Sequence, residues 1–200
     1  MPRSFNPAPC NPQGGHTAGD KIMRSTPGLP MERFLQTLAI VAREGKHLAY
    51  SWRGLFRQTI DVAWVSRLEH APDIAEQLEA FVSRFGRMQD TMADKLFPRW
   101  LLALAEMPGS QIETLNRAER LGVLASTERW LEARSLRNRL VHEYMTDPAL
   151  FVANLFLAKE YSVMLLDTFN RLREDAITRM GYENEVLPEA LVLPPRDSGG

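Results

Sequence analysis

Cysteine is almost absent from this chain, since Cys10 is the single thiol among 200 residues. One thiol excludes an internal disulfide, and no His/Cys spacing is typical of a zinc site. The formal net charge is only −1, so any contact with RNA or DNA has to come from a local cluster of arginines. No run approaches the ~18 apolar residues of a membrane span, and the N-terminus lacks the apolar core of a signal peptide. We therefore expect a cytoplasmic protein that needs no metal, cofactor or membrane.

Residues that disrupt regular structure gather at the two ends of the chain. Residues 1–30 are rich in proline and glycine and show no apolar periodicity, and residues 181–200 lose the periodicity again and carry Pro188, Pro194 and Pro195. Such composition predicts a disordered tail at each end. The remaining residues, 31–180, are sufficient for one domain, because the chain has a globular composition with 44% hydrophobic and 24% charged residues.

Between the tails, apolar residues recur at three, four or seven positions, as on the buried face of an α-helix. The pattern predicts helices over about 32–55, 60–68, 110–121, 126–144 and 148–180, and a helix of about nine turns from Ile74 that Pro108-Gly109 ends. Pro98 is expected to kink the helix that begins at Ile74. Ser110 precedes Glu113 at the spacing of a capping box, and Asp147-Pro148 is a second start signal. With no convincing strand, the predicted fold is an all-α bundle of five or six helices.

The richest chemistry lies in eleven residues, Arg134-Ser135-Leu136-Arg137-Asn138-Arg139-Leu140-Val141-His142-Glu143-Tyr144. At about 100° per residue, Asn138 and His142 share one face of a helix, while Arg137 and Tyr144 align on another. One regular helix does not direct all four side chains at one point. A shared site needs the helix to unwind near His142, an Arg137 side chain that wraps round, or a second copy of the segment from a C2 dimer partner.

These residue types suit a phosphodiester substrate. Arginine binds phosphate bidentately, and the neutral imidazole of His142 takes a proton from a ribose 2′-hydroxyl near pH 7. Asn138 then orients the imidazole or a phosphate oxygen, and Tyr144 stacks on a base or donates to phosphate. The alternative is that Arg137, Arg139 and His142 are simply cations near a helix C-terminus, which are favoured there by ~0.3–1 kcal/mol. Spacing alone leaves both interpretations open.

Residues 137–144 resemble the signature of the HEPN superfamily, in which an arginine and a polar residue are followed after a few residues by histidine. The version here continues to tyrosine and is similar to HepT-like toxins, and the likeness extends over about residues 75–175. It implies an all-α homodimer with two signatures at one cleft, metal-independent cleavage of RNA, and a minimal nucleotidyltransferase antitoxin that adds AMP to the tyrosine. By that likeness Arg137 and His142 are catalytic, Asn138 is supporting, and Tyr144 is the modification target.

Four further arginines are candidates for RNA contact: Arg84, Arg87, Arg134 and Arg139. Arg84 and Arg87 lie with Asp90 at helical spacings, where charged groups either reach the cleft or form ion pairs on the bundle surface. The predicted function is an RNase toxin that is neutralised by AMP on Tyr144. The alternative is a non-catalytic subunit that presents a nucleotide or substrate to a minimal nucleotidyltransferase.

Overall fold

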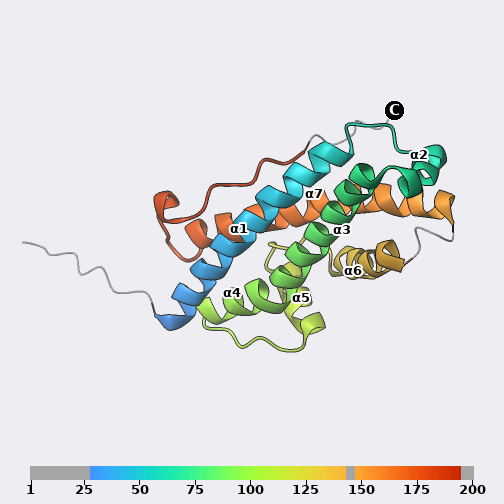
Figure 1. Ribbon diagram of the computed structural model, residues 1–200. Coiled ribbons are helices and arrows are strands. Elements are labelled where there is room, and N and C mark those ends of the chain that lie inside the picture. Colours follow the sequence, from blue (N-terminus) through green and yellow to red (C-terminus); the bar gives the residue numbers. More distant parts are fainter. Residues whose placement is uncertain (1–27, 143–146, 195–200) are drawn as a thin grey trace, which may run out of the picture.

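The computed structural model describes residues 28–142 and 147–194, with the side chains of residues 141 and 142 left out. Within that part of the chain all regular structure is helical and no strand occurs (Figure 1). The helices are α1 (Leu29–Leu55), α2 (Val62–Arg67), α3 (Pro72–Thr91), α4 (Phe97–Ala103), α5 (Gln111–Arg120), α6 (Thr127–His142) and α7 (Pro148–Thr178). Because α3 and α4 form one interrupted helix, the predicted all-α bundle of five or six helices is confirmed.

Local capping signals decide where the helices begin. The hydroxyl of Ser110 accepts a hydrogen bond from the backbone N–H of Glu113 at 3.3 Å, and the Glu113 carboxylate accepts one from the N–H of Ser110 at 2.7 Å. The predicted capping box of α5 is therefore confirmed, and these hydrogen bonds hold the pKa of Glu113 below its usual value. At the start of α7, the Asp147 carboxylate accepts from the N–H of Leu150 at 3.0 Å, as the Asp-Pro signal predicts.

The long helix predicted from Ile74 to Pro108-Gly109 is interrupted slightly before Pro98, and its second part ends at Ala103. After α3, residues Met92–Leu96 form a π turn in which the N–H of Phe97 donates to the carbonyl of Met92. Pro98 then stands in the first turn of α4, where its missing N–H costs no hydrogen bond. The chain changes direction between α3 and α4 (Figure 1). The predicted disturbance is thus confirmed, although its form is a π turn.

The core lies where α1, α3, α4, α6 and α7 meet. Its largest fully buried side chains are Trp64, Trp100, Trp130, Phe34, Phe81, Phe85, Phe97, Phe151 and Phe169. One acid is buried with them, because the Asp175 carboxylate accepts a hydrogen bond from the indole N–H of Trp100 at 2.7 Å and pairs with Arg179 at 3.1 Å. A buried carboxylate with both partners is satisfied, and it ties α7 to α4.

Helix α7 is long and apolar enough to cross a membrane by length and composition, and it alone among the described residues has this property. Half of its most apolar window is buried inside the bundle. Phe151, Leu155 and Leu165 are fully buried along it, and core helices of soluble proteins pass the same test. The buried side chains of α7 therefore form part of the core of the bundle.

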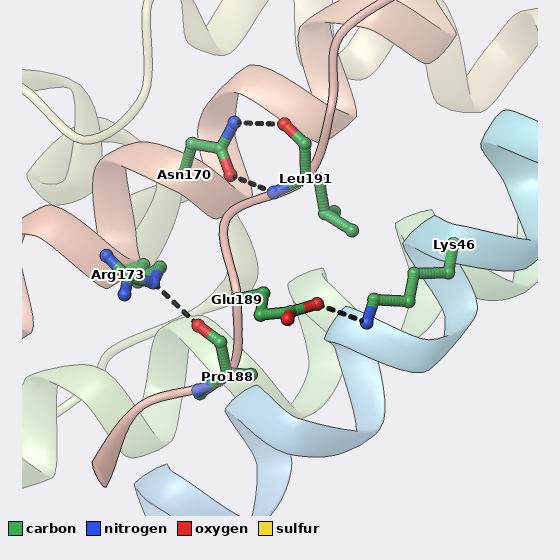
Figure 2. A network of polar contacts seen from close by, with 6 residues as sticks. All are labelled: Lys46, Asn170, Arg173, Pro188, Glu189 and Leu191. Atoms are coloured by element: carbon green, nitrogen blue, oxygen red, sulfur yellow. Dashed lines mark hydrogen bonds and ion pairs between the residues drawn. The ribbon is translucent and has the colours of Figure 1, made fainter. Parts of the chain in front are cut away.

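A strap formed by residues 181–194 follows α7 and runs back along the bundle (Figure 1). The amide side chain of Asn170 donates to the carbonyl of Leu191 at 2.9 Å and accepts from its N–H at 2.8 Å (Figure 2). Arg173 donates to the carbonyl of Pro188 at 2.6 Å, and Lys46 pairs with Glu189 at 2.9 Å. These contacts attach the strap to α7 and to α1.

This strap differs from the disordered tail predicted over 181–200. Leu187 and Leu191 are buried, and the Leu191 side chain lies so close to Gly45 of α1 that a Cβ there would collide with it. Buried apolar groups offset the conformational entropy that ordering costs, but two buried leucines on either side of Pro188 and Glu189 are too few to form an apolar stripe in the sequence. Residues 195–200, and all but the last three residues of the tail predicted over 1–30, lie outside the described residues. Those last residues belong to the start of the bundle, because α1 begins at Leu29.

Candidate functional site

Arg137 stands on the C-terminal half of α6, which is held against the bundle by its buried face. That face consists of Trp130, Ala133, Leu136 and Leu140. The side chain of Arg137 passes directly over Gly86 of α3, because a Cβ built on Gly86 would lie 2.7 Å from Nε and 3.1 Å from Cγ of Arg137. A glycine at this position therefore allows the arginine to lie flat against α3.

Asp90, one turn further along α3, is the ionic partner of Arg137. The Nη2 atom of Arg137 lies 3.5 Å from Oδ2 of Asp90, and the two side chains are 40% and 42% exposed. An ion pair with this exposure contributes about 0–1 kcal/mol to folding. Its main effect is to orient the guanidinium, which remains accessible to an anion from solvent.

Arg137 opens onto a groove of about 880 Å³ along α3, which we call the α3 groove. Its polar side chains are Ser66, Glu69, Glu79, Ser83, Arg87, Asp90, Thr91 and Arg137. Its apolar side chains are Val65, Leu68, Ala75, Leu78, Val82, Leu140 and Pro148. The residues come from α2 and the turn after it, from α3, from the C-terminal half of α6 and from the start of α7. A concave site with an apolar wall and a few charged groups is the usual form of a ligand site.

The structure brings only some of the predicted site residues to this groove. Arg137, Arg87 and Asp90 line it together. Arg84 points to α1, where it donates to the hydroxyl of Ser51, and it lines a different hollow between α1 and α3. The position of Arg84 therefore does not support the prediction that it contacts RNA in the same cleft as Arg137.

The polar residues of α6 at 134, 138 and 139 are not among those that line the α3 groove. Arg134 donates to the side chain of Gln111 on α5, and Arg139 lies 3.4 Å from the hydroxyl of Ser135 on its own helix. Asn138 is exposed. His142 is the last residue of α6, but its side chain lies outside the described residues, as does the whole of Tyr144. The convergence of Arg137, Asn138, His142 and Tyr144 therefore remains a prediction.

The sequence pattern did not reveal the apolar wall of the groove. Leu78 continues the stripe of the long helix predicted from Ile74, and Val65 belongs to the short helix before it, so the sequence indicates ordinary core residues at both positions. The pattern identifies an apolar face, but the packing of α2 determines that this part of the face borders a groove. Nothing in the sequence singled out Gly86 either, because a glycine inside a helix does not show which side chain from another helix will lie over it.

Glu44 on α1 contacts Thr91 of α3, one of the residues that line the α3 groove. Its Oε1 atom accepts a hydrogen bond from the hydroxyl of Thr91 at 3.1 Å, while the buried Oε2 atom has no hydrogen-bond partner among the described residues. Burial raises the pKa of this carboxyl above its ordinary value of 4.5, and the Thr91 hydrogen bond and the charges of Arg87 and Lys95 offset part of that rise. The charged form of Glu44 therefore destabilises the folded protein relative to the neutral form.

Replacing Glu44 by glutamine is expected to raise the thermal unfolding midpoint at pH 7. A carboxyl whose pKa is raised by folding stabilises the protein fully only below its unfolded pKa, and that contribution is lost as the pH rises through the folded pKa. The amide is neutral at every pH, so the advantage of Glu44→Gln should shrink as the pH falls from 7 towards 4. Thermal unfolding followed by circular dichroism at the two pH values measures this difference. The exposed Glu76→Gln change on α3 is the control, and a Glu44→Gln variant that is less stable at pH 7 contradicts the prediction.

Within the described residues, no group of three or more His, Cys, Asp or Glu side chains is arranged to hold a metal ion. No protein family, curated protein or solved structure matches this chain. Function is therefore inferred from residues 134–144 and from the geometry around Arg137.

Proposed function

We propose that this protein is a metal-independent endoribonuclease toxin in which Arg137 binds the scissile phosphate and His142 is the general base. The position of Arg137 is the observation that carries the proposal. Its side chain crosses Gly86, is oriented by Asp90 at 3.5 Å and is still 40% exposed. Arg87 lines the same groove. Two guanidiniums provide a local site for phosphate on a chain with a net charge of only −1.

The proposed reaction is an internal transesterification of RNA. His142 takes the proton of a ribose 2′-hydroxyl, the 2′-oxygen attacks phosphorus, and the bond from phosphorus to the 5′-oxygen breaks. The leaving 5′-oxygen takes a proton from water, so the products carry a 2′,3′-cyclic phosphate and a 5′-hydroxyl. Arg137 stabilises the charge that builds on the non-bridging oxygens, and Asn138 orients the imidazole. The resemblance of residues 137–144 to the HEPN signature supports these roles.

Protein purified without any partner is the test, incubated with RNA in the presence of EDTA. The proposal expects cleavage fragments that end in cyclic phosphate. A folded protein that leaves RNA intact would instead favour the second candidate, a non-catalytic subunit that binds a nucleotide or substrate for a minimal nucleotidyltransferase. The apolar wall of the α3 groove supports this candidate as well, because such a wall accommodates a nucleotide without any chemistry.

The proposal includes a homodimer, because one α6 helix does not direct all the signature side chains at one point. A C2 dimer brings two copies of the same helix end to one cleft. Light scattering of the purified protein is expected to give a mass twice the 22.7 kDa of the chain. A monomer at all accessible concentrations would contradict this part of the proposal.

Tyr144 is the proposed acceptor of AMP from a cognate nucleotidyltransferase. Its phenol oxygen would attack the α-phosphorus of ATP and release pyrophosphate, which leaves an added AMP with negative charge. That charge would occupy the arginines and exclude an RNA phosphate, so cleavage should be lost. Intact-mass spectrometry after co-expression is expected to show one or more AMP units on Tyr144, and Tyr144→Phe should abolish the addition. Full RNase activity of the AMP-bearing protein would refute this switch.

A further inference from the structure

A second hollow, of about 700 Å³, lies between the C-terminal end of α1 and α3, and we call it the α1–α3 hollow. Its charged side chains are those of Arg53, Arg57, Arg84, Asp73 and Glu76. Three arginines against two carboxylates give its described lining a net charge of +1. The guanidiniums of Arg53 and Arg57 are exposed, and neither forms a hydrogen bond or ion pair with another described residue. Unpaired cations at a concave surface attract an anionic ligand.

Tyr50 adds an aromatic surface to this hollow. It lines the hollow and is 70% exposed. Tyr50 and Arg53 are three residues apart on α1, so their side chains are neighbours on one face of the helix. Proteins bind single-stranded nucleic acid with this combination, because the ring stacks on a base and the cation binds a phosphate of the backbone. The α3 groove has no aromatic side chain in its described lining, so stacking is possible only in the second hollow.

Gly54 leaves the backbone of α1 open within the hollow. A glycine in a helix is less stable than alanine, so it usually has a structural reason. At Gly45 and Gly86 another side chain of the protein lies over the glycine. Gly54 has no positive φ, and a Cβ built on it would meet no atom within 4 Å. Its backbone is therefore accessible to a ligand that approaches closely.

Arg84 connects this hollow to the α3 groove. Its guanidinium donates to the hydroxyl of Ser51, and a guanidinium has five N–H donors, so others remain for a ligand. Arg87, three residues later, lines the α3 groove together with Arg137. At about 100° per residue, the side chains of Arg84 and Arg87 leave α3 about 60° apart and about 4.5 Å apart along its axis. Cations therefore follow one another from the α1–α3 hollow, across α3, to Arg137.

The two acids of the hollow lie toward the beginning of α3. Asp73 and Glu76 precede Arg84 by 11 and 8 residues, which corresponds to about 17 and 12 Å along the helix axis. Both separations exceed a Debye length of about 10 Å at 0.1 M salt, so these acids repel a phosphate at Arg84 only weakly. A backbone that continued toward the start of α3 would meet both carboxylates. The charges thus limit the hollow to the end of a strand.

We propose that the α1–α3 hollow is a second RNA subsite, in which one base stacks on Tyr50 and a neighbouring phosphate binds Arg53 and Arg84. This inference rests on the proposed function, since the same strand crosses α3 at Arg87 and continues to the scissile phosphate at Arg137. It defines the substrate as single-stranded RNA that extends beyond the cleaved bond. A base inside a duplex is already stacked and paired, so it does not cover the tyrosine ring.

Binding of a fluorescent ten-nucleotide RNA with methylated 2′-hydroxyls tests this subsite. Methylation removes the nucleophile, so the full chain binds the RNA in EDTA without cleaving it. We expect Tyr50→Ala to weaken binding of the single strand about tenfold, Tyr50→Phe to retain it, and Tyr50→Ala to have no effect on the duplex. Arg53→Ala should lower the slope of log affinity against log salt by about 0.7, the value for one phosphate contact. Arg33→Ala, which removes an exposed arginine of α1 about 30 Å along the axis from Arg53, is the matched control and should change neither quantity.

Gly54→Leu provides an independent check. Leucine is the better helix former, and a Cβ at this position meets no atom within 4 Å, so the fold should be at least as stable by thermal unfolding. The leucine side chain occupies the hollow, and binding of the single strand should fall by a similar factor. A Gly54→Leu protein that binds the strand like the unaltered chain would contradict the subsite.

Unchanged affinity for the single strand in both Tyr50→Ala and Arg53→Ala would overturn the inference, and would point to an acidic protein segment as the ligand of the hollow. Two strands bound per chain would also overturn it, because the hollow and Arg137 would then bind separate molecules. Cleavage of unmodified RNA separates this inference from the proposed function. A chain that cleaves RNA but binds it independently of Tyr50 and Arg53 refutes the subsite alone. Binding that depends on Tyr50 in a chain that never cleaves RNA refutes the ribonuclease alone.

Discussion

Replacing Arg137 by alanine is expected to lower the rate of RNA cleavage about a thousandfold, because donors that stabilise transition-state charge have effects of this size. The bundle should remain folded. The ion pair of Arg137 with Asp90 spans 3.5 Å between side chains that are 40% and 42% exposed, and such pairs contribute little to stability. Loss of activity without loss of stability is the combination that a role in phosphate binding predicts.

Single-turnover cleavage of a labelled RNA in EDTA measures this effect, and circular dichroism checks the fold. Arg134→Ala is the matched control, since Arg134 is an exposed arginine on the same helix that contacts Gln111 instead of the α3 groove. It should cleave RNA at nearly the rate of the unaltered protein. If Arg137→Ala cleaves as fast as Arg134→Ala, the assignment of Arg137 to the phosphate is wrong.

Gly86→Ala examines the same assignment without removing the guanidinium. The new methyl group would lie 2.7 Å from Nε of Arg137, so the arginine side chain has to move. Alanine is the better helix former by roughly 0.5–1 kcal/mol, and the atoms that move belong to a flexible side chain. Cleavage should therefore fall while stability stays the same or rises. A fall in both quantities would mean that the glycine serves packing instead.

Replacing Trp130 by alanine is expected to destabilise the bundle by about 3–5 kcal/mol, which is a large part of the roughly 5–15 kcal/mol that folded domains possess. Trp130 is completely buried in α6. Its ring meets Phe97 edge-on at a centroid distance of 5.2 Å. Its backbone carbonyl, which the substitution leaves in place, accepts a hydrogen bond from the buried Gln89 side chain at 3.2 Å. The indole therefore joins α6 to the long interrupted helix, and its loss would leave a cavity beneath the helix that carries Arg137.

Urea unfolding followed by circular dichroism measures this loss. Tyr50→Ala is the control, because Tyr50 is an aromatic residue that is 70% exposed, and changes at such positions stay within about 0.5 kcal/mol. Trp130→Phe should lie between the two, since it keeps part of the ring and removes an indole N–H that has no acceptor among the described residues. A Trp130→Ala variant as stable as Tyr50→Ala would show that α6 is held by other contacts.

Helix boundaries were largely predictable because they depend on local chemistry. The capping box at Ser110, the proline after Asp147 and the left-handed glycine after α5, Gly122 with φ of 82°, each act within a few residues. The strap after α7 was not predictable, because it depends on Asn170 and Gly45, which are distant in the chain. A segment that is stabilised mainly by partners elsewhere in the chain lacks the long apolar stripe by which a helix is recognised.

By itself, the sequence determined the all-α class, the order of the helices, and the concentration of arginines and other polar residues in 134–144. Helical periodicity and capping depend on residues that are close together in the chain, so they can be recognised from the sequence alone. The tertiary structure alone decided which arginines lie together: Arg137 and Arg87 share a groove with Asp90, whereas Arg84 faces α1 and Arg134 faces α5. The packing of α6 against α3 at Gly86 sets that division, because the direction of a side chain depends on the helix it meets as well as on its own.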